Sequence, residues 1–454
     1  MSVSATVEQA QSIIARIERI PFSTWHTSIR LIVGIATFFD AIDALTIAYV
    51  MPALIPLFKI PPTRIGGLIA IGYVGQLIGA IFFGWLAEKI GRRDSLLASV
   101  ALYTVMSFAC AASSSYAMLF TFRTIQGLGL GGEVPIAAAY ISELSKAKGR
   151  GRFVLLYEML FAIGLLVAAL LGYWIVPRLG WRWMFMIGGL PAILALCLRW
   201  IVPESPRWLI NKGRLEEADK IVTYIERKVS QNGKIPLPPV EVALQVPQKK
   251  TQWRELFQGI YLKRTLVLWC IWFCAYFCNY GLVTWLPSLY TQVYKLPLKQ
   301  GLQYSLINQA AALALAFVCA LLIDKMGRKA WFLMSFVCGG TFLLALFFTG
   351  AGTATLLLTL GALGNMFVAS IAMALYVYSP EVYPTRMRAL GSSTGTVWLR
   401  LASILGPIIV GFIVAGTNIK WAFLMFGVVS LIGALIVGLF AIETKGRPLE
   451  ELSP

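Results

Sequence analysis

Long apolar runs recur along the whole of this 454-residue sequence. Hydrophobic residues make up 58% of the chain and charged residues only 13%, whereas a soluble domain usually carries about a quarter charged residues. So few charges would not cover a water-facing surface. A helix of about 20 apolar residues spans the roughly 30 Å hydrocarbon core of a bilayer. We therefore predict an all-α membrane protein rather than a soluble one.

The apolar runs predict twelve transmembrane helices joined by polar loops. The predicted spans are residues 28–58, 64–87, 94–113, 116–142, 152–177, 181–201, 264–292, 300–323, 330–349, 354–380, 388–415 and 419–441. A longer polar segment separates the first six spans from the last six. The expected organisation is a tail (1–27), a six-helix bundle (28–202), a linker (203–263), a second six-helix bundle (264–441) and a tail (442–454).

The net charge of +18 comes mainly from Lys and Arg in the two tails and in every second loop. This bias is the positive-inside signal, so we expect a multi-pass protein of the inner or plasma membrane with both termini cytoplasmic. The basic side would face anionic lipid headgroups, so the charge gives no reason to expect nucleic acid as a partner. The first 27 residues lack the apolar core of a cleavable signal peptide, and the first span should itself direct insertion.

The two halves of the chain repeat the same short motifs. GWLAEKIGRR (84–93) aligns with ALLIDKMGRK (320–329), and YISELSKAKGR (140–150) aligns with YSPEVYPTRMR (378–388). VPESPRWL after the sixth span corresponds to IETKGRPL after the twelfth. Because the three matches share nearly one offset, the chain is predicted to be a duplicated six-span unit. Parallel repeats of this kind place a substrate site between the halves, near the bilayer midplane.

The first of these motifs resembles the signature of the major facilitator superfamily of transporters, and the resemblance covers essentially the whole chain. The departures are modest: Glu88 replaces the usual Asp, and the second copy has Ala320 for Gly and Lys329 for Arg. PESPRWL and ETKGRPLEE look like loops of the branch that holds sugar porters and organic-ion and synaptic-vesicle-type transporters.

The charged loops on the basic side are candidates for a gate. Glycine permits the sharp turn that each short loop needs, and Glu88 and Asp324 lie four residues before Arg92 and Arg328. We expect further pairs between Glu143 and Arg150, Glu381 and Arg388, and Glu204 and Arg207. The full set is Glu88, Gly91, Arg92, Arg93, Glu143, Arg150, Glu204, Arg207, Asp324, Gly327, Arg328, Glu381 and Arg388. The family resemblance implies that they form an inner latch, closed when the site faces outward; the alternative is that they only fix topology and bind lipid.

Six charged residues lie deep inside predicted spans, away from the span ends: Asp40, Asp43, Arg123, Glu133, Glu158 and Arg400. Charges at bilayer depth are costly and usually functional, so we expect them to face an aqueous cavity or one another. Asp40 and Asp43 share a helix face, and their mutual repulsion favours proton uptake by at least one of them. We assign Asp40, Asp43, Arg123, Glu133 and Glu158 to proton coupling. Static pairing of the aspartates with Arg123 or another basic group, and a structural role for Glu133, remain alternatives.

The fourth span contains RTIQGLGLGGEVP (123–135). Its glycines at Gly127, Gly129 and Gly131 let neighbouring helices approach closely. Arg123 followed by this glycine pattern resembles the family's fourth-span motif, in which the arginine is linked to proton handling.

The second half supplies the candidate substrate contacts. The seventh span places aromatic residues at helical spacing beside an amide, and spans 8 and 10 add further amides; the proposed contacts are Tyr276, Asn279, Tyr280, Trp285, Asn308, Gln309 and Asn365. Arg400 in the eleventh span has a planar guanidinium suited to a carboxylate. Together these residues favour a small, flat aromatic acid. The alternatives are ordinary core packing of the rings and a structural Arg400 paired with an internal acid.

The family comparison narrows the substrate. D-A-I-D at 40–43 resembles the D-G-x-D motif of aromatic-acid/proton symporters, with Ala41 for Gly, and RTIQGLGLGGEVPIAAAYISE looks most like bacterial nicotinate (vitamin B3) importers. The resemblance implies proton-coupled uptake of nicotinate. A sugar porter is ranked lower because CNYGLVTW lacks the usual seventh-span amide pattern. An organic-cation porter is disfavoured by Arg400, although the acidic first half leaves it open.

Other classes of function have less support. The single histidine, His26, precedes the first span, and the sequence has no metal-ligand cluster, Walker loop or G-x-S-x-G motif. We therefore expect neither an enzyme nor a bound cofactor. The protein should act as a monomer on a small molecule, with protons and lipids as its other partners. A non-transporting, receptor-like member of the fold remains an alternative.

Overall fold

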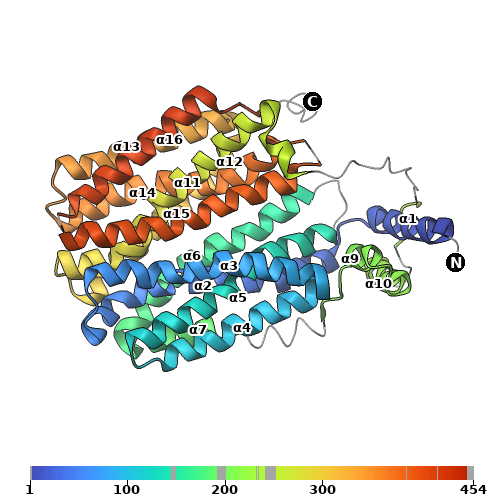
Figure 1. Cartoon of the computed structure of the whole chain (residues 1–454), viewed down its shortest axis with the longest axis horizontal. Coiled ribbons are helices and arrows are strands. Elements are labelled where there is room, and N and C mark those ends of the chain that lie inside the picture. The colour runs from blue at the N-terminus through green and yellow to red at the C-terminus, as the bar shows by residue number, and fades with distance from the viewer. Residues whose placement is uncertain are drawn as a thin grey trace.

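The computed structural model describes residues 3–144, 150–191, 201–231, 233, 235–240, 252–384, 386–416 and 418–446, with the side chains of residues 3–7, 150–159 and 389 excepted. Its described elements are helices, which pack lengthwise into two bundles (Figure 1). The first bundle contains α2 (Thr24–Phe58), α3 (Pro62–Ile90), α4 (Arg92–Ala112), α5 (Tyr116–Glu143), α6 (Arg150–Leu179) and α7 (Arg182–Gly188). The second contains α11 (Gly259–Ser288), α12 (Leu298–Met326), α13 (Arg328–Phe348), α14 (Ala354–Glu381), α15 (Arg388–Gly416) and α16 (Lys420–Phe440).

Ten helices in the described part of the chain are long and apolar enough to cross a membrane. The predicted fourth span, α5, is not among them, although it has 28 residues; it carries the buried charges of Arg123 and Glu133. The predicted sixth span begins with α7 and continues into residues 192–200, which lie outside the described residues. The all-α, two-bundle fold expected from the repeats is confirmed.

The two bundles meet along the first, second and fifth helices of each half. α3 packs on α15, α6 packs on α12, and α2 packs on α11. At the end where α3 begins, the α3–α15 contact is close enough to exclude side chains: a β-carbon on Gly66 would lie 2.4 Å from the backbone oxygen of Pro407. We call this end of the molecule the far end. The bundles are therefore tightly closed against each other there along α3 and α15.

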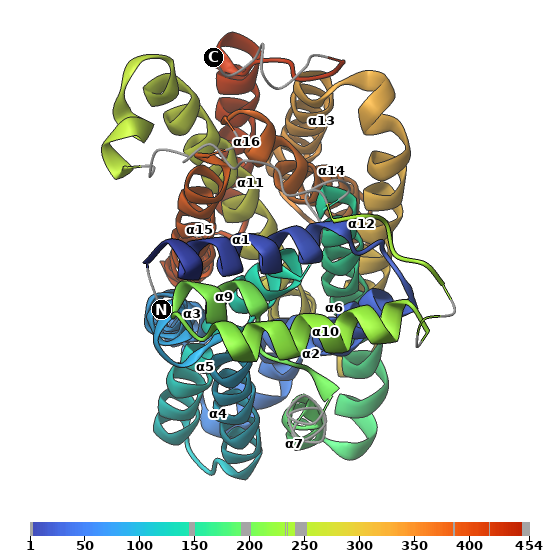
Figure 2. The same cartoon turned by 90° about the vertical axis from the view of Figure 1, so that its right-hand side faces the viewer.

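The opposite end carries three further helices outside the bundles. α1 (Val3–Arg19), α9 (Pro206–Asn211) and α10 (Leu215–Val229) lie across this end, which we call the basic end (Figure 2). Ile13 and Ile17 of α1 are buried in one apolar cluster with Trp208 and Val222. Polar contacts flank the cluster, because Arg16 pairs with Asp219 and Glu226. The first helix of the chain is thus bound to the segment that follows the first bundle.

Two glycines end the helices that reach the basic end in each half. Gly91 follows α3 with φ of 111°, and Gly327 follows α12 with φ of 98°. Side chains rarely adopt these values, so glycine is needed at both turns. This confirms the expectation that both glycines permit a sharp turn. The remaining helical segments are a 3-10 turn, η1 (Trp253–Phe257), and a π-helical turn, η2 (Leu289–Val293), at either end of α11.

Candidate functional site

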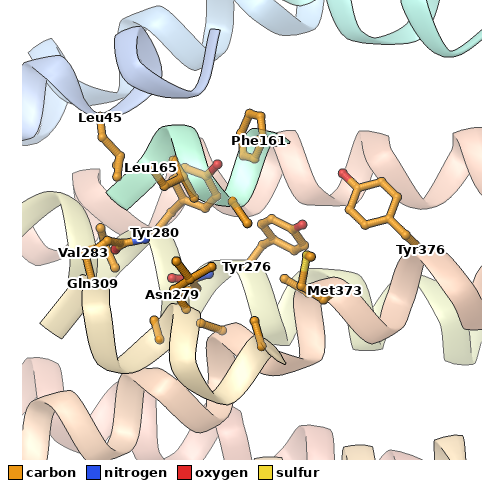
Figure 3. A pocket seen from close by; sticks show the side chains of 16 residues that line it. Leu45, Phe161, Leu165, Tyr276, Asn279, Tyr280, Val283, Gln309, Met373 and Tyr376 are labelled. Atoms are coloured by element: carbon orange, nitrogen blue, oxygen red, sulfur yellow. The ribbon is translucent and has the colours of Figure 1, made fainter. Parts of the chain in front are cut away.

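A cavity of about 80 Å³ lies between the two bundles (Figure 3). Leu45 of α2 and Phe161 and Leu165 of α6 form its wall in the first bundle. The wall in the second bundle comes from α11, α12 and α14: Tyr276, Asn279, Tyr280, Val283, Gln309, Ala312, Leu313, Ala316, Ala369, Ala372, Met373 and Tyr376. Ala162 completes the lining. Its lining, mostly apolar with a few polar groups, is of the kind that binds small organic ligands.

Four of the eight predicted substrate contacts line this cavity: Tyr276, Asn279, Tyr280 and Gln309. The rings of the cavity wall continue a stacked column along α11. Trp272 stacks on Tyr276 with ring centres 5.3 Å apart, and Tyr276 stacks on Tyr280 at 5.7 Å. Both alternatives, core packing and substrate contact, therefore apply to this column: the end at Trp272 packs in the core, and the end at Tyr276 and Tyr280 faces the cavity.

The other four predicted contacts do not line the cavity. The indole nitrogen of Trp285 donates to the backbone oxygen of Pro407 at 3.0 Å. Asn365 donates to Asn308 at 3.3 Å, so these two amides bind each other within the second bundle. Arg400 donates to the side-chain oxygen of a residue that the sequence analysis did not select, Gln76 of α3.

Phe161 and Tyr376 were also missed as cavity residues. Phe161 lies in a largely apolar stretch, FVLLYEMLFAIG, so nothing in the sequence distinguishes it from a lipid-facing ring. Tyr376 is one of two tyrosines near the end of α14, and only the rotation of that helix places it on the cavity (Figure 3). Gln76 could have been found, because an amide inside an apolar span is itself a signal.

A buried ion pair lies inside the first bundle. Arg123 of α5 donates to Asp43 of α2 at 3.0 Å, and both side chains are almost completely buried. Gln126 joins the two partners, since its amide donates to Asp43 at 2.9 Å and its oxygen accepts from Arg123 at 2.8 Å. The same amide donates to Ser107 of α4 at 2.6 Å. Four side chains from three helices thus form one connected polar group, with the pairing of Asp43 and Arg123 that the sequence left as an alternative.

The remaining predicted proton-coupling acids occupy different surroundings. Asp40 is 3% exposed and Glu133 is fully buried, and neither lines the cavity. The hydroxyl of Thr37, one turn before Asp40 on α2, donates to Glu133 at 2.9 Å. The side chain of Glu158 lies outside the described residues. Asp40 and Asp43 are therefore both buried, and Asp43 accepts a hydrogen bond from Arg123.

The predicted i, i+4 pairs of the basic end are present. Arg92 pairs with Glu88 at 2.7 Å, and Arg328 pairs with Asp324 at 2.9 Å. Each arginine also reaches the end of the fourth helix of its own bundle. Arg92 contacts Glu143 at 3.0 Å. Arg328 makes the equivalent contact with Glu381 at 2.9 Å. These ion pairs all lie within a bundle rather than between bundles.

Two of the other expected pairings are wrong. Arg388 donates to the backbone oxygen of Tyr383 at 3.3 Å, because Glu381 is already bound by Arg328. Arg207 contacts Glu18 of α1 at 2.5 Å instead of Glu204. The side chain of Arg150, the expected partner of Glu143, lies outside the described residues. The side chain of Arg93 pairs only with its neighbour Asp94 among the described ion pairs, at 2.8 Å.

Glu204 instead accepts hydrogen bonds from the first backbone N–H groups of α4. Arg92 donates to it at 2.9 Å and Arg93 at 3.2 Å. The first N–H groups of a helix lack partners within the helix and favour a negative charge. Burial nevertheless raises the pKa of Glu204, because these hydrogen bonds only partly offset the loss of hydration.

Glu443 has the same position in the second half. It accepts from the backbone N–H groups of Arg328 at 2.9 Å and Lys329 at 3.0 Å, at the start of α13. Burial opposes ionisation of Glu443, but backbone N–H groups, including those of Thr444 and Lys445, outweigh it and lower its pKa. The two carboxylates are thus equivalent in geometry and opposite in the direction of their pKa shifts.

Comparison with known proteins agrees with this architecture. The family described as "Sugar (and other) transporter" matches residues 35–454. The chain belongs to this family of the major facilitator superfamily. Its fold is similar to that of the xylose transporter XylE from E. coli in a partially occluded inward open conformation, with a TM-score of 0.74 and 21% identity over 94% of this chain and 100% of that chain.

Two bacterial relatives are similar over nearly the whole chain. The niacin transporter NiaP of Acinetobacter baylyi is 37% identical over 97% of this chain and 99% of its own length. The putative niacin/nicotinamide transporter NiaP of Bacillus subtilis is 31% identical over 92% of this chain and 96% of its own. The family and these relatives are transporters, so this chain is a multi-pass membrane transporter and not an enzyme.

Proposed function

We propose that this transporter carries nicotinate, or a closely related small aromatic carboxylate, into the cell by alternating access coupled to protons. The observation that carries the proposal is the cavity between the bundles, which combines tyrosine rings with the amides of Asn279 and Gln309. The names of the two NiaP relatives support the same substrate class. A flat heteroaromatic ring matches the stacked rings of α11, and the amides offer hydrogen bonds to a ring nitrogen and a carboxyl group.

In this proposal Arg400 neutralises the substrate carboxylate. The described cavity lining holds no charged residue, and an unpaired carboxylate would be costly to bury there. Arg400 binds Gln76, which lies one turn of α3 after Tyr73, and the ring of Tyr73 contacts that of Tyr280 on the cavity wall. A guanidinium at this position can reach an anion by a side-chain movement, without a change of fold.

The polar group around Asp43 is the proposed proton-coupling element, with Asp40, Glu133 and Glu158 as further candidates. Protonation of Asp43 would remove the negative charge that pairs with Arg123, and the arginine would then be free to move. Because the pair joins α2 to α5 inside one bundle, a proton there can change the shape of that bundle at the cavity wall, to which α2 contributes Leu45.

The basic end is proposed to face the cytoplasm of a cell whose inner or plasma membrane holds the protein as a monomer. The ion pairs of Arg92 and Arg328 would then fasten the inner ends of the helices in each bundle.

A sugar is the second candidate substrate, because the matched family is described by sugars. An organic cation ranks below it, since the charge of Arg400 would repel a cation. A receptor-like protein of the same fold would bind the acid without moving it across the membrane.

Counterflow of labelled nicotinate into proteoliposomes tests the proposal. We expect saturable, proton-dependent uptake that unlabelled nicotinate and benzoates inhibit, and that hexoses and organic amines do not. Arg400→Ala should abolish saturable binding of the acid. Inhibition by hexoses but not by nicotinate would contradict nicotinate as the substrate and indicate a sugar. Binding of nicotinate without counterflow would indicate a receptor rather than a transporter.

A further inference from the structure

Gln76 and Arg400 form a hydrogen bond between the two bundles. Gln76 lies near the middle of α3 and Arg400 near the middle of α15, and the guanidinium donates to the side-chain oxygen of the amide. Gln76 is 2% exposed and Arg400 is half-buried, so the contact is partly shielded from water. It therefore joins the halves at mid-depth, separately from the close α3–α15 contact at the far end.

The backbone of Gln76 is fixed in place by α5. A β-carbon on Gly131 would lie 2.0 Å from the backbone oxygen of Gln76, and one on Gly75 would lie 2.3 Å from that of Thr124. Helices packed this closely leave the backbone no room to shift. The amide of Gln76 thus presents its oxygen to Arg400 from a rigid support.

Gln76 provides the arginine with a hydrogen-bond acceptor without neutralising it. The amide oxygen of Gln76 is an uncharged acceptor. The guanidinium of Arg400 has five N–H donors, which are arranged to bind a carboxylate through two parallel hydrogen bonds. A carboxylate adds the attraction of opposite charges and can accept two parallel hydrogen bonds from the guanidinium, neither of which the single amide oxygen of Gln76 offers. A carboxylate that reaches Arg400 is therefore a better partner than Gln76, and Gln76 is a better partner than none.

Tyr280 connects this contact to the cavity. It lines the cavity, and its ring meets that of Tyr73 with centres 5.2 Å apart. Tyr73 lies one turn before Gln76 on α3. An anion bound beside Tyr280 is accordingly next to the Arg400–Gln76 hydrogen bond.

We propose that Gln76 is the resting partner of Arg400 and that the carboxylate of a bound substrate displaces it. This inference rests on the proposed function, which it deepens by assigning Gln76 a role in substrate selection. Displacement removes a hydrogen bond between the bundles only when an acid is bound. Gln76 is then a positioning residue that acts through Arg400 and distinguishes an acid from its uncharged amide.

The test compares the binding of nicotinate and nicotinamide to the full-length protein in lipid nanodiscs. The two probes share a ring and differ in charge. Gln76→Glu has nearly the same shape and gives Arg400 a permanent anionic partner. We expect it to weaken nicotinate binding at least tenfold, which corresponds to about 1.4 kcal/mol, and to leave nicotinamide binding unchanged. Gln76→Leu, which leaves Arg400 free, should keep or increase nicotinate affinity.

Two controls separate this effect from a general one. Gln300→Glu adds the same charge near the far end of α12, where Gln300 donates to Tyr304, and it should not alter the ratio of the two affinities. In an Arg400→Ala background, where saturable nicotinate binding is already expected to be lost, Gln76→Glu should leave nicotinamide binding unchanged, because Gln76 acts through Arg400.

The outcomes are distinguishable. Nicotinate affinity that is normal in Gln76→Glu would overturn the displacement and leave the proposed function standing. Equal losses for both probes in both Gln76 variants would show a purely structural role, which also overturns it. A wild-type protein that binds no aromatic acid would overturn the proposed function and this inference together.

Discussion

A β-carbon on Gly91 would lie 2.2 Å from the Oε2 atom of Glu204. The glycine therefore provides more than a turn: it leaves the space in which the carboxylate of Glu204 reaches the first N–H groups of α4. Gly327 and Glu443 repeat the relationship in the second half, where the corresponding distance is 2.5 Å. The motif at the basic end thus combines a turn with a binding place for a carboxylate from the segment after each bundle.

Gly91→Ala should destabilise the first bundle. The new methyl group would displace Glu204 and would also require alanine at φ of 111°. Loss of a helix-capping hydrogen bond costs about 0.5–2 kcal/mol, and a strained backbone adds a cost on the order of 1–3 kcal/mol. We expect a lower thermal unfolding temperature in detergent. Gly84→Ala is the matched control, because its β-carbon would meet nothing within 4 Å; equal stability of the two variants would contradict the prediction.

The two capping carboxylates should respond to pH in opposite directions. The folded pKa of Glu443 is lowered from 4.5, so its stabilising effect is present above that value and is lost as the pH falls through the folded pKa. The pKa of Glu204 is raised from 4.5, so its contribution is present below that value and is lost as the pH rises through the folded pKa.

Glu443→Gln should therefore destabilise the protein at neutral pH by more than Glu204→Gln does. The difference between the variants should shrink as the pH approaches about 4, near the usual pKa of a glutamate. Thermal unfolding of both variants and the wild type, followed from acidic to neutral pH, provides the measurement. Identical losses at neutral pH would mean that the two sites do not differ in charge stabilisation.

Asp43→Asn should flatten the pH dependence of uptake and reduce its rate strongly. Removing one partner of a buried ion pair leaves an uncompensated charge and costs about 3–5 kcal/mol. The double variant Asp43→Asn/Arg123→Gln removes both charges, so it should recover stability without recovering the pH response. Uptake measured from acidic to neutral pH, with unfolding temperatures for each variant, separates the two effects. A normal pH profile in Asp43→Asn would place proton coupling elsewhere.

Arg92→Ala should slow transport while membrane insertion remains normal. Arg92 links the end of α3 to the end of α5 through Glu88 and Glu143, so its loss loosens the basic end of the first bundle. Arg328→Ala should act in the same way on the second. The exposed Arg214, which pairs with Glu217, offers a control substitution to Ala with little effect. Unchanged uptake at normal expression in Arg92→Ala would leave these ion pairs a role in topology alone.

The fold was predictable because hydropathy and repetition act over many residues. A run of apolar residues must form a helix in lipid whatever its exact neighbours are, and three repeated motifs marked the division into halves. The site was predictable only in part, because the face that each residue presents depends on how its helix is rotated. Tyr276 and Asn279 line the cavity, whereas Asn308, next to Gln309 in the chain, turns towards Asn365 instead.

The predicted pairings of Glu204 and Arg388 were wrong because backbone groups are partners of these side chains. Glu204 was matched with Arg207, three residues away, but the backbone N–H groups at the start of α4 bind its carboxylate instead. Gln76 and Gln126 were not predicted, because in the first half of the chain the prediction rested on charged residues, although each amide contacts a buried or half-buried arginine. Uncharged groups that can both donate and accept are the natural partners of a charge in an apolar interior.

The attachment of α1 to α10 has a practical consequence. Ile13 and Ile17 cover Leu209, Leu215 and Val222 on a part of the molecule that projects beyond the bundles. Shortening the amino-terminal tail to obtain a more compact sample would expose this apolar surface to water and promote aggregation. Proteins prepared for crystallisation, or fused to a partner, should accordingly retain the first helix, with any tag placed ahead of it.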